Sequence, residues 1–179
     1  RFWRALPPKG KIGVFFGSWY TAPIVQRVMG KTKASALDQS IDEINRFEKM
    51  LTNEGALIVK FWFHLAKDVQ RKRLKSLEKD PKTRWRVTEL DWERFKLYDK
   101  FRKVSEHALR ATSTAEAPWI VVEGADPRYR NLTTAKTLLQ ALRKRLDNPA
   151  QPVPSNAPPL QAAIDRLDVF DKLDMTQKI

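Results

Sequence analysis

Apolar residues fall into two patterns along this chain: short continuous runs, and longer stretches with helical spacing. The short runs are Ile12–Phe16, Ala56–Phe63 and Trp119–Glu123. They are rich in β-branched and aromatic residues, which predicts buried strands. Helical spacing predicts helices over about 24–29, 36–53, 67–78, 89–110 and 128–146. Strands that alternate with helices favour an α/β fold with a parallel, three-layer sheet.

Turn and capping residues mark several of these boundaries. Gly55 follows the helix that ends near residue 53 and has the character of a C-cap. Thr88 and Asp91 are spaced as in a capping box, and Asp126 before Pro127 suits an N-cap followed by the first helical residue. The predicted elements therefore have local start and stop signals as well as periodicity.

The composition changes sharply after residue 147. Five prolines between residues 148 and 159 predict a stiff, extended linker. Residues 160–179 are amphipathic, but a segment of about twenty residues cannot bury one apolar face alone. We expect a domain over residues 1–147, a linker over 148–159 and the start of a following domain over 160–179. The apolar face of that last segment comprises Ile164, Leu167, Val169, Phe170 and Leu173.

The chain is strongly basic, with 34 Lys and Arg residues against 21 Asp and Glu, a net charge of +13. Such an excess favours a polyanionic partner: nucleic acid, an anionic membrane or a phosphate polymer. The absence of cysteine excludes disulfides, thiolate catalysis and Cys-ligated zinc. No apolar run approaches the roughly 20 residues of a membrane span, and no signal peptide is visible. We expect a cytoplasmic protein with no membrane partner. The chain does not begin with Met, and we expect it to be part of something longer.

Positive charge is concentrated in residues 67–103, which hold 14 basic and 7 acidic residues. Arg71 and Lys75 share a helical face, and Arg84 and Arg86 flank Trp85 after a helix break. Guanidinium groups beside an aromatic ring suit phosphate oxygens and a stacked base. One interpretation is a lid that closes over an anionic ligand; the other is a pair of solvated helices with internal salt bridges. The predicted phosphate-binding residues are Arg71, Arg73, Lys75, Lys82, Arg84 and Arg86, and Trp85 is predicted to stack on a base or pack the lid.

The end of the first predicted strand lacks an expected carboxylate. Ligands of α/β folds bind at the carboxyl ends of strands, where a phosphoryl-transfer enzyme places an Asp to hold Mg²⁺. This chain has Phe16 and Gly17 there, followed by Ser18-Trp19-Tyr20. The strand-end motif of residues 17–20 therefore resembles a phosphate-handling site without its metal ligand, and we predict no catalytic residue and no metal ligand in this chain.

Other candidates for chemistry are weaker. His64 and His107 lack any metal-ligand spacing, and Ser18 has no base partner that would make it a nucleophile. The hydroxyls of Thr112-Ser113-Thr114 suit either phosphate oxygens or a turn after a helix, and the turn is favoured. No GxxxxGK[ST] loop occurs in the sequence.

Taken in order, these motifs resemble the polyphosphate kinase 2 family, and more narrowly the first half of its two-domain polyphosphate:AMP phosphotransferases. Ser18-Trp19-Tyr20 matches the end of the family's Walker-B pattern Phe-Asp-Arg-Ser-Trp-Tyr, with Phe16 and Gly17 at the Asp and Arg places. Residues 43–51 (EINRFEKML), 60–64 (KFWFH) and 112–119 (TSTAEAPW) resemble further family motifs. In what would be the lid, family order is kept by Lys67, Gln70, Arg73, Asp80-Pro81 and Trp85-Arg86.

The resemblance covers about residues 1–146 and implies a P-loop-kinase-like α/β fold with a helical basic lid. It implies phosphoryl transfer from inorganic polyphosphate to a nucleotide, AMP in the two-domain members, with Mg²⁺. The Walker-A loop would lie upstream of Arg1, so the N-terminal part of the domain would be absent. The Phe16 ring cannot ligate a metal, so we expect a supporting domain that packs against a second domain of the same polypeptide, in a homo-oligomer.

Two other functions stay open. The same cations would serve a non-enzymatic module that binds nucleic acid or another polyanion, although no recognisable reading element appears. A purely structural dimerisation domain would bind no ligand at all.

Overall fold

The computed structural model describes residues 2–148, so the predicted linker beyond Asn148 and the segment 160–179 lie outside the described residues. Two strands form a parallel pair, β1 (Lys60–His64) and β2 (Trp119–Glu123). Six α-helices and two short 3₁₀ segments surround them in the described part of the chain. The helical elements are η1 (Trp3–Ala5), α1 (Thr21–Val28), α2 (Ala34–Asn53), α3 (Lys67–Lys79), η2 (Arg84–Arg86), α4 (Glu89–Lys96), α5 (Tyr98–Thr112) and α6 (Pro127–Asp147).

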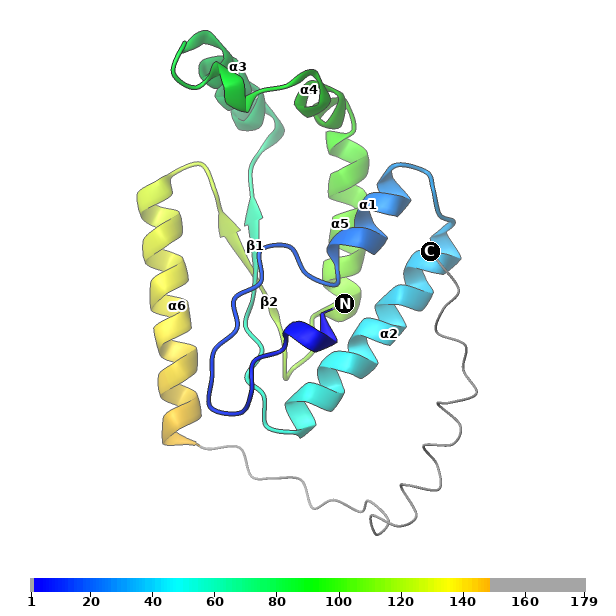
Figure 1. The fold of residues 1–179 in the computed structure, drawn as a ribbon, viewed down its shortest axis with the longest axis vertical. Coiled ribbons are helices and arrows are strands. Elements are labelled where there is room, and N and C mark those ends of the chain that lie inside the picture. The colour runs from blue at the N-terminus through cyan, green and yellow to red at the C-terminus, as the bar shows by residue number, and fades with distance from the viewer. Residues whose placement is uncertain (1, 149–179) are drawn as a thin grey trace.

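The strand pair lies between two groups of helices (Figure 1). Lys60 pairs with Trp119 at one end and His64 with Glu123 at the other, so both carboxyl ends lie at the same edge. Helix α6 lies on one side of the pair, while α1, α2 and α5 lie on the other. The prediction of an α/β fold with parallel strands is confirmed at this level. The sheet of the described residues has two strands.

The prediction of a strand over Ile12–Phe16 is wrong. This segment has no strand structure, and Ile12, Val14 and Phe16 are 73%, 74% and 97% exposed. A strand needs a neighbouring strand to satisfy its backbone groups, and β1 pairs with β2 rather than with this segment. The apolar run instead follows a turn in which the Lys11 amide donates to the Pro8 carbonyl, 3.1 Å away.

Aromatic contacts hold this N-terminal segment against α2. Phe15 lies 6.0 Å from Trp19 between ring centroids, and Trp19 makes an edge-to-face contact with Phe47 of α2 at 5.1 Å. Trp3 contacts the same Phe47 ring at 5.9 Å. Phe15 is therefore packed while its neighbour Phe16 faces solvent, an arrangement that the sequence pattern did not distinguish.

The main core lies where α1, α2 and α5 meet. Its buried members come from all three helices and from Tyr20, which directly precedes α1. The boundaries follow the capping signals: Thr88 and Asp91 form the predicted capping box, and Asp126 accepts from the Arg128 and Tyr129 amides at the start of α6. The cluster comprises Tyr20, Ile24, Val28, Leu37, Ile41, Ile44 and Ala108.

The lid begins at the carboxyl end of β1, where α3 and α4 project beyond the body of the domain (Figure 1). The predicted single helix over about 89–110 is wrong, because the chain forms α4 and α5 with a break at Leu97. Buried Phe95 anchors α4, while the Tyr98 hydroxyl donates to the Leu65 carbonyl at 2.9 Å and fixes the start of α5. These contacts place α4 in the lid and α5 in the core, with the break at Leu97 between them.

Candidate phosphate-binding site

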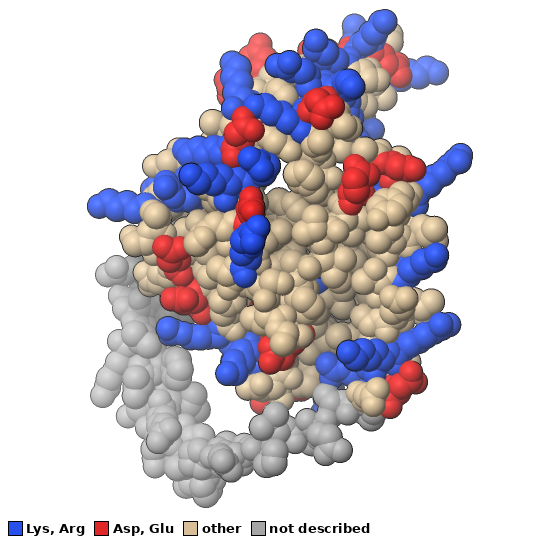
Figure 2. All heavy atoms as spheres, turned by 180° about the vertical axis from the view of Figure 1, so that it is seen from behind, with Lys and Arg blue, Asp and Glu red and all other residues tan. Residues whose placement is uncertain are grey.

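The six predicted phosphate-binding residues all lie on the lid and are all exposed. Those of α3 are Arg71, Arg73 and Lys75; the others follow in the loop and in η2. Arg71 and Lys75 are one helical turn apart, whereas Arg73 faces elsewhere on α3, so the six do not form a single cluster. A view from behind shows many Lys and Arg side chains over the lid, with acidic side chains interspersed among them (Figure 2).

None of these six cations has an ion-pair partner among residues 2–148. The ion pairs that the lid does contain join Lys67 to Asp99 and Lys72 to Asp68. Two acids that could have neutralised the lid are engaged elsewhere: Glu78 accepts from the Trp92 indole, and Asp91 is held by the capping box. These six cations therefore lack the internal salt bridges of the alternative interpretation, and their side chains are exposed to solvent.

Trp85 lies at the tip of the lid and is 76% exposed. Its indole N–H donates to the Lys82 carbonyl at 3.0 Å, which fixes the ring without burying it. Most of the ring surface is therefore accessible to solvent in η2, which also holds Arg84 and Arg86.

A small basic cavity of about 350 Å³ lies where α3 meets α4. Lys67, Arg71 and Lys96 line it together with the rings of Trp92 and Phe95. The Arg71 guanidinium lies 5.6 Å from the centroid of Phe95, so a cation–π contact positions this predicted residue.

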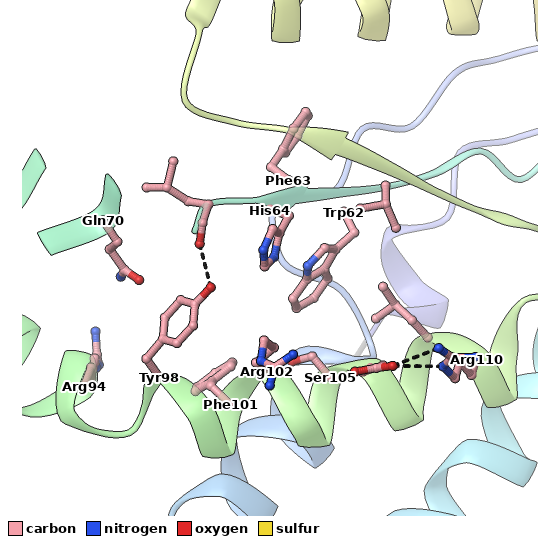
Figure 3. Close-up of a pocket in the computed structure, with 14 residues that line it drawn as sticks. Trp62, Phe63, His64, Gln70, Arg94, Tyr98, Phe101, Arg102, Ser105 and Arg110 are labelled. Carbon is pink, nitrogen blue, oxygen red and sulfur yellow. Dashed lines mark hydrogen bonds and ion pairs between the residues drawn. The ribbon is translucent and has the colours of Figure 1, made fainter. Parts of the chain in front are cut away.

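A larger cavity of about 670 Å³ lies at the base of the lid, between β1 and α5 (Figure 3). Aromatic side chains from both elements face it, including Trp62, Tyr98 and Phe101, and Arg94 and Arg102 lie along its α4–α5 side. Aromatic and aliphatic residues make up half of its lining, and polar or charged residues, among them His64, Arg102 and Glu106, make up the other half. The sequence analysis did not predict this cavity, because its lining residues come together only when α5 packs near β1.

The strand-end motif has a different place from the predicted one. Gly17 has a φ of +71° in a bend, and Tyr20 is 5% exposed in the core. The Tyr20 hydroxyl and the Trp19 indole both donate to Glu48 Oε1, at 2.6 and 3.1 Å. The motif thus anchors the chain to α2, and residues 17–20 do not line either cavity described above.

Sequence reasoning also missed a buried ion pair that completes this anchor. Lys60 Nζ of β1 donates to Glu48 Oε2 and to the Thr112 carbonyl, each at 2.7 Å, and to the Tyr20 hydroxyl at 3.1 Å. Glu48 and Lys60 are 2% and 6% exposed. We call Glu48, Lys60, Tyr20 and Thr112 the buried hub. It joins α2, β1, α5 and the segment before α1, and so connects four motifs that lie far apart in the sequence.

Burial also shifts the protonation equilibria within the hub. Desolvation, with the hydrogen bond to Glu48, raises the pKa of Tyr20 far above its usual range, so this hydroxyl stays a donor. Desolvation lowers the pKa of Lys60, and the adjacent Glu48 carboxylate opposes that shift. Because both partners are paired and almost inaccessible, the hub stabilises the fold rather than contacting a ligand.

The hydroxyls of residues 112–114 are engaged in the turn after α5. Thr112 Oγ1 donates to the Ala108 carbonyl at 2.7 Å and accepts from the Trp119 indole at 2.8 Å. Ser113 Oγ accepts from the Trp119 amide and Thr114 Oγ1 from the Ala117 amide. The favoured interpretation of this motif as a turn is confirmed, and the structure gives no support for a role in binding phosphate.

The residues at the strand-end position do not fit Mg²⁺. Phe16 offers no donor atom and Gly17 no side chain, and within residues 2–148 no three His, Cys, Asp or Glu side chains are grouped to hold a metal ion. His107 pairs instead with Asp38 at 2.8 Å, on the surface. Within that same range, no helix has the length and apolar character that crossing a membrane requires.

Comparison with known proteins gives this lid-bearing α/β fold its family. The family model described as polyphosphate kinase 2 matches residues 1–150. A polyphosphate:AMP phosphotransferase of Pseudomonas aeruginosa is 49% identical over 179 residues, 99% of this chain and 36% of that protein. The crystal structure of a putative polyphosphate kinase 2 from Pseudomonas aeruginosa shares 43% identity with a TM-score of 0.70, covering 99% of this chain and 32% of the other. Polyphosphate kinase 2 from Arthrobacter aurescens shares 30% identity with a TM-score of 0.76, covering 94% and 57%.

The α/β fold with its projecting lid is therefore shared with solved polyphosphate kinase 2 structures. The chain belongs to the polyphosphate kinase 2 family. It spans about a third of the length of the Pseudomonas aeruginosa phosphotransferase that it matches.

Proposed function

We propose that this chain is the supporting first domain of a polyphosphate-dependent nucleotide kinase that transfers a phosphoryl group to AMP. The proposal takes its reaction from the relatives, which are named for polyphosphate and AMP. It takes the supporting role from this chain, where an exposed Phe16 stands at the family's Asp position. In the complete enzyme, the three-layer P-loop-kinase-like sheet, the Walker-A loop and the Mg²⁺ ligands would include residues outside this chain.

One observation carries the proposal: the six lid cations have no ion-pair partner among the described residues. Exposed cations that have no ion-pair partner are free to contact the oxygens of a bound phosphate chain. A linear polyanion suits cations that are spread along α3, the loop and η2 better than a compact phosphate does. The role of the domain is then to bind polyphosphate and hold it for transfer, with positioning as its contribution to rate.

The test uses the whole protein with Arg84→Gln and Arg86→Gln combined. A supporting, polyphosphate-binding domain predicts a several-fold rise in KM for polyphosphate with little change in kcat. The matched control is Lys9→Gln with Lys11→Gln, which removes the same charge from an exposed N-terminal loop. Unchanged kinetics in the lid variant would support a purely structural domain, and a loss of kcat alone would place these arginines in the catalytic step.

A competition experiment separates this proposal from a nucleic-acid-binding module. Labelled polyphosphate bound to the chain should be displaced by unlabelled polyphosphate at far lower phosphate concentration than by single-stranded RNA. Equal or stronger competition by RNA would favour the nucleic-acid module.

A further inference from the structure

Helix α6 exposes an apolar stripe that no described element covers. Leu132, Leu139 and Leu146 recur every seven residues, two helical turns apart, and are 56%, 47% and 78% exposed. In Figure 1 no described element lies on the side of α6 that faces away from the strands. We call these three leucines the α6 stripe.

The side of α6 that faces the sheet holds different residues. Thr133, Thr137 and Ala141 are half-buried there, and Arg145 donates to the Gly55 carbonyl at 3.0 Å. Leu142 is also half-buried, whereas the three stripe leucines point away from the domain, although a surface helix normally turns its apolar residues toward the core. A stripe of this kind indicates a helical partner.

The chain itself contains a segment that matches the stripe. Between residues 164 and 174, an apolar residue followed directly by Asp occurs four times, every third residue. The stripe is bordered by Lys136 and Arg143, each one helical turn after a stripe leucine. The aspartates of these pairs carry charge opposite to that of Lys136 and Arg143 beside the stripe. The four pairs are Ile164-Asp165, Leu167-Asp168, Phe170-Asp171 and Leu173-Asp174.

The linker has the length that this contact needs. Residues 149–159 follow α6 after Asn148, and an extended Pro-rich chain of this length reaches about 34 Å at ~3.1 Å per residue. Helix α6 has 21 residues, or about 31 Å at ~1.5 Å per residue. The maximum reach of the linker is therefore about equal to the length of the helix that carries the stripe. A short tether also gives the segment a high effective concentration beside its target.

We propose that residues 160–179 dock as an amphipathic helix on the α6 stripe, with their aspartates beside Lys136 and Arg143. The contact would fix the segment after the linker against this domain, and it does not depend on the proposed function. It predicts that the stripe is shielded from solvent in the complete chain.

The chain contains no cysteine, so a single introduced thiol reports its own exposure. In the 179-residue chain with Leu139→Cys, docking predicts maleimide labelling at least tenfold slower than with Gln140→Cys, a neighbouring exposed position outside the stripe. Leu132→Cys gives a second reporter on the stripe. Leu167→Asp combined with Phe170→Asp should restore fast labelling at the stripe while leaving the Gln140→Cys rate unchanged.

Three outcomes would overturn the proposal. Equal labelling rates at positions 139 and 140 would show an open stripe. Slow labelling that persists in the Leu167→Asp, Phe170→Asp variant would show that something other than residues 160–179 covers it. Protection that disappears on dilution, together with a dimer in sedimentation, would assign the stripe to a second copy of the chain.

Discussion

Replacing Lys60 by Met tests the buried hub most sharply. The substitution keeps an unbranched side chain but removes an ammonium that makes three hydrogen bonds, to Glu48, Thr112 and Tyr20. It leaves the Glu48 carboxylate, 2% exposed, with the Tyr20 hydroxyl and the Trp19 indole as its donors. Breaking a buried ion pair in this way costs about 3–5 kcal/mol. That is a large part of the roughly 5–15 kcal/mol that stabilises a typical domain.

The assay is urea unfolding followed by tryptophan fluorescence and circular dichroism, with the slope m checked for constancy. We expect the midpoint to fall far enough for the variant to unfold in mild urea. Lys67→Met is the matched control, because Lys67 and its partner Asp99 are 46% and 64% exposed. An exposed pair contributes only about 0–1 kcal/mol, so the control should be nearly as stable as the native chain.

A double-mutant cycle then tests whether the partners act together. Glu48→Leu combined with Lys60→Met removes both charges, and the remaining cost is the unpaired polar groups around them, about 1–3 kcal/mol. The double variant should therefore be more stable than Lys60→Met alone. A loss equal to the sum of the two single losses would refute the account of Glu48 and Lys60 as a coupled, buried pair.

Three further predictions concern the lid and the strands. Hydrogen bonds from the Thr88 amide and hydroxyl lower the pKa of Asp91 below its usual 3.8. The stabilisation by the Asp91 carboxylate is therefore fully present above pH 3.8 and is lost as the pH falls through the lowered pKa. Asp91→Asn should lower the urea midpoint more at pH 6 than at pH 2.5, and a deficit of equal size at both pH values would contradict this. Gly124→Ala places a Cβ 3.0 Å from the His64 carbonyl oxygen and should lower the thermal midpoint measurably, whereas an unchanged midpoint would show that the strand ends move apart freely. Trp85→Ala should change the unfolding free energy by no more than about 0.5 kcal/mol, because the ring is exposed. The same substitution should abolish the tryptophan fluorescence quenching that we expect when AMP binds. Quenching that persists in the variant would show that the Trp85 indole is not part of the nucleotide site.

Local signals predicted much of the helical structure, because their causes lie within a few residues. The capping box at Thr88, the N-cap at Asp126 and the positive φ of Gly55 all lie where the sequence placed them. The Ile12–Phe16 run shows the limit of such signals. Its β-branched and aromatic residues suit a strand, but pairing depends on a partner strand that local composition does not reveal.

The buried hub was missed for a related reason, since its members are brought together only by the fold. A signal was nevertheless present in the sequence. Glu48 follows Ile41 and Ile44 on the apolar face of α2, and Lys60 interrupts an otherwise apolar run. A charge of each sign at a core position indicates a buried pair. The lid cations could be predicted together because they are close in sequence. The cavity between β1 and α5 could not, because it forms only when α5 packs on β1.

In the function proposed above, this chain binds polyphosphate but does not itself catalyse phosphoryl transfer. The most direct measurement gives the 179-residue chain polyphosphate, AMP and Mg²⁺, and follows both binding and product in one experiment. The account predicts saturable polyphosphate binding that weakens as salt rises, with no ADP or ATP formed. Steady formation of either nucleotide, or no binding at low salt, would contradict it.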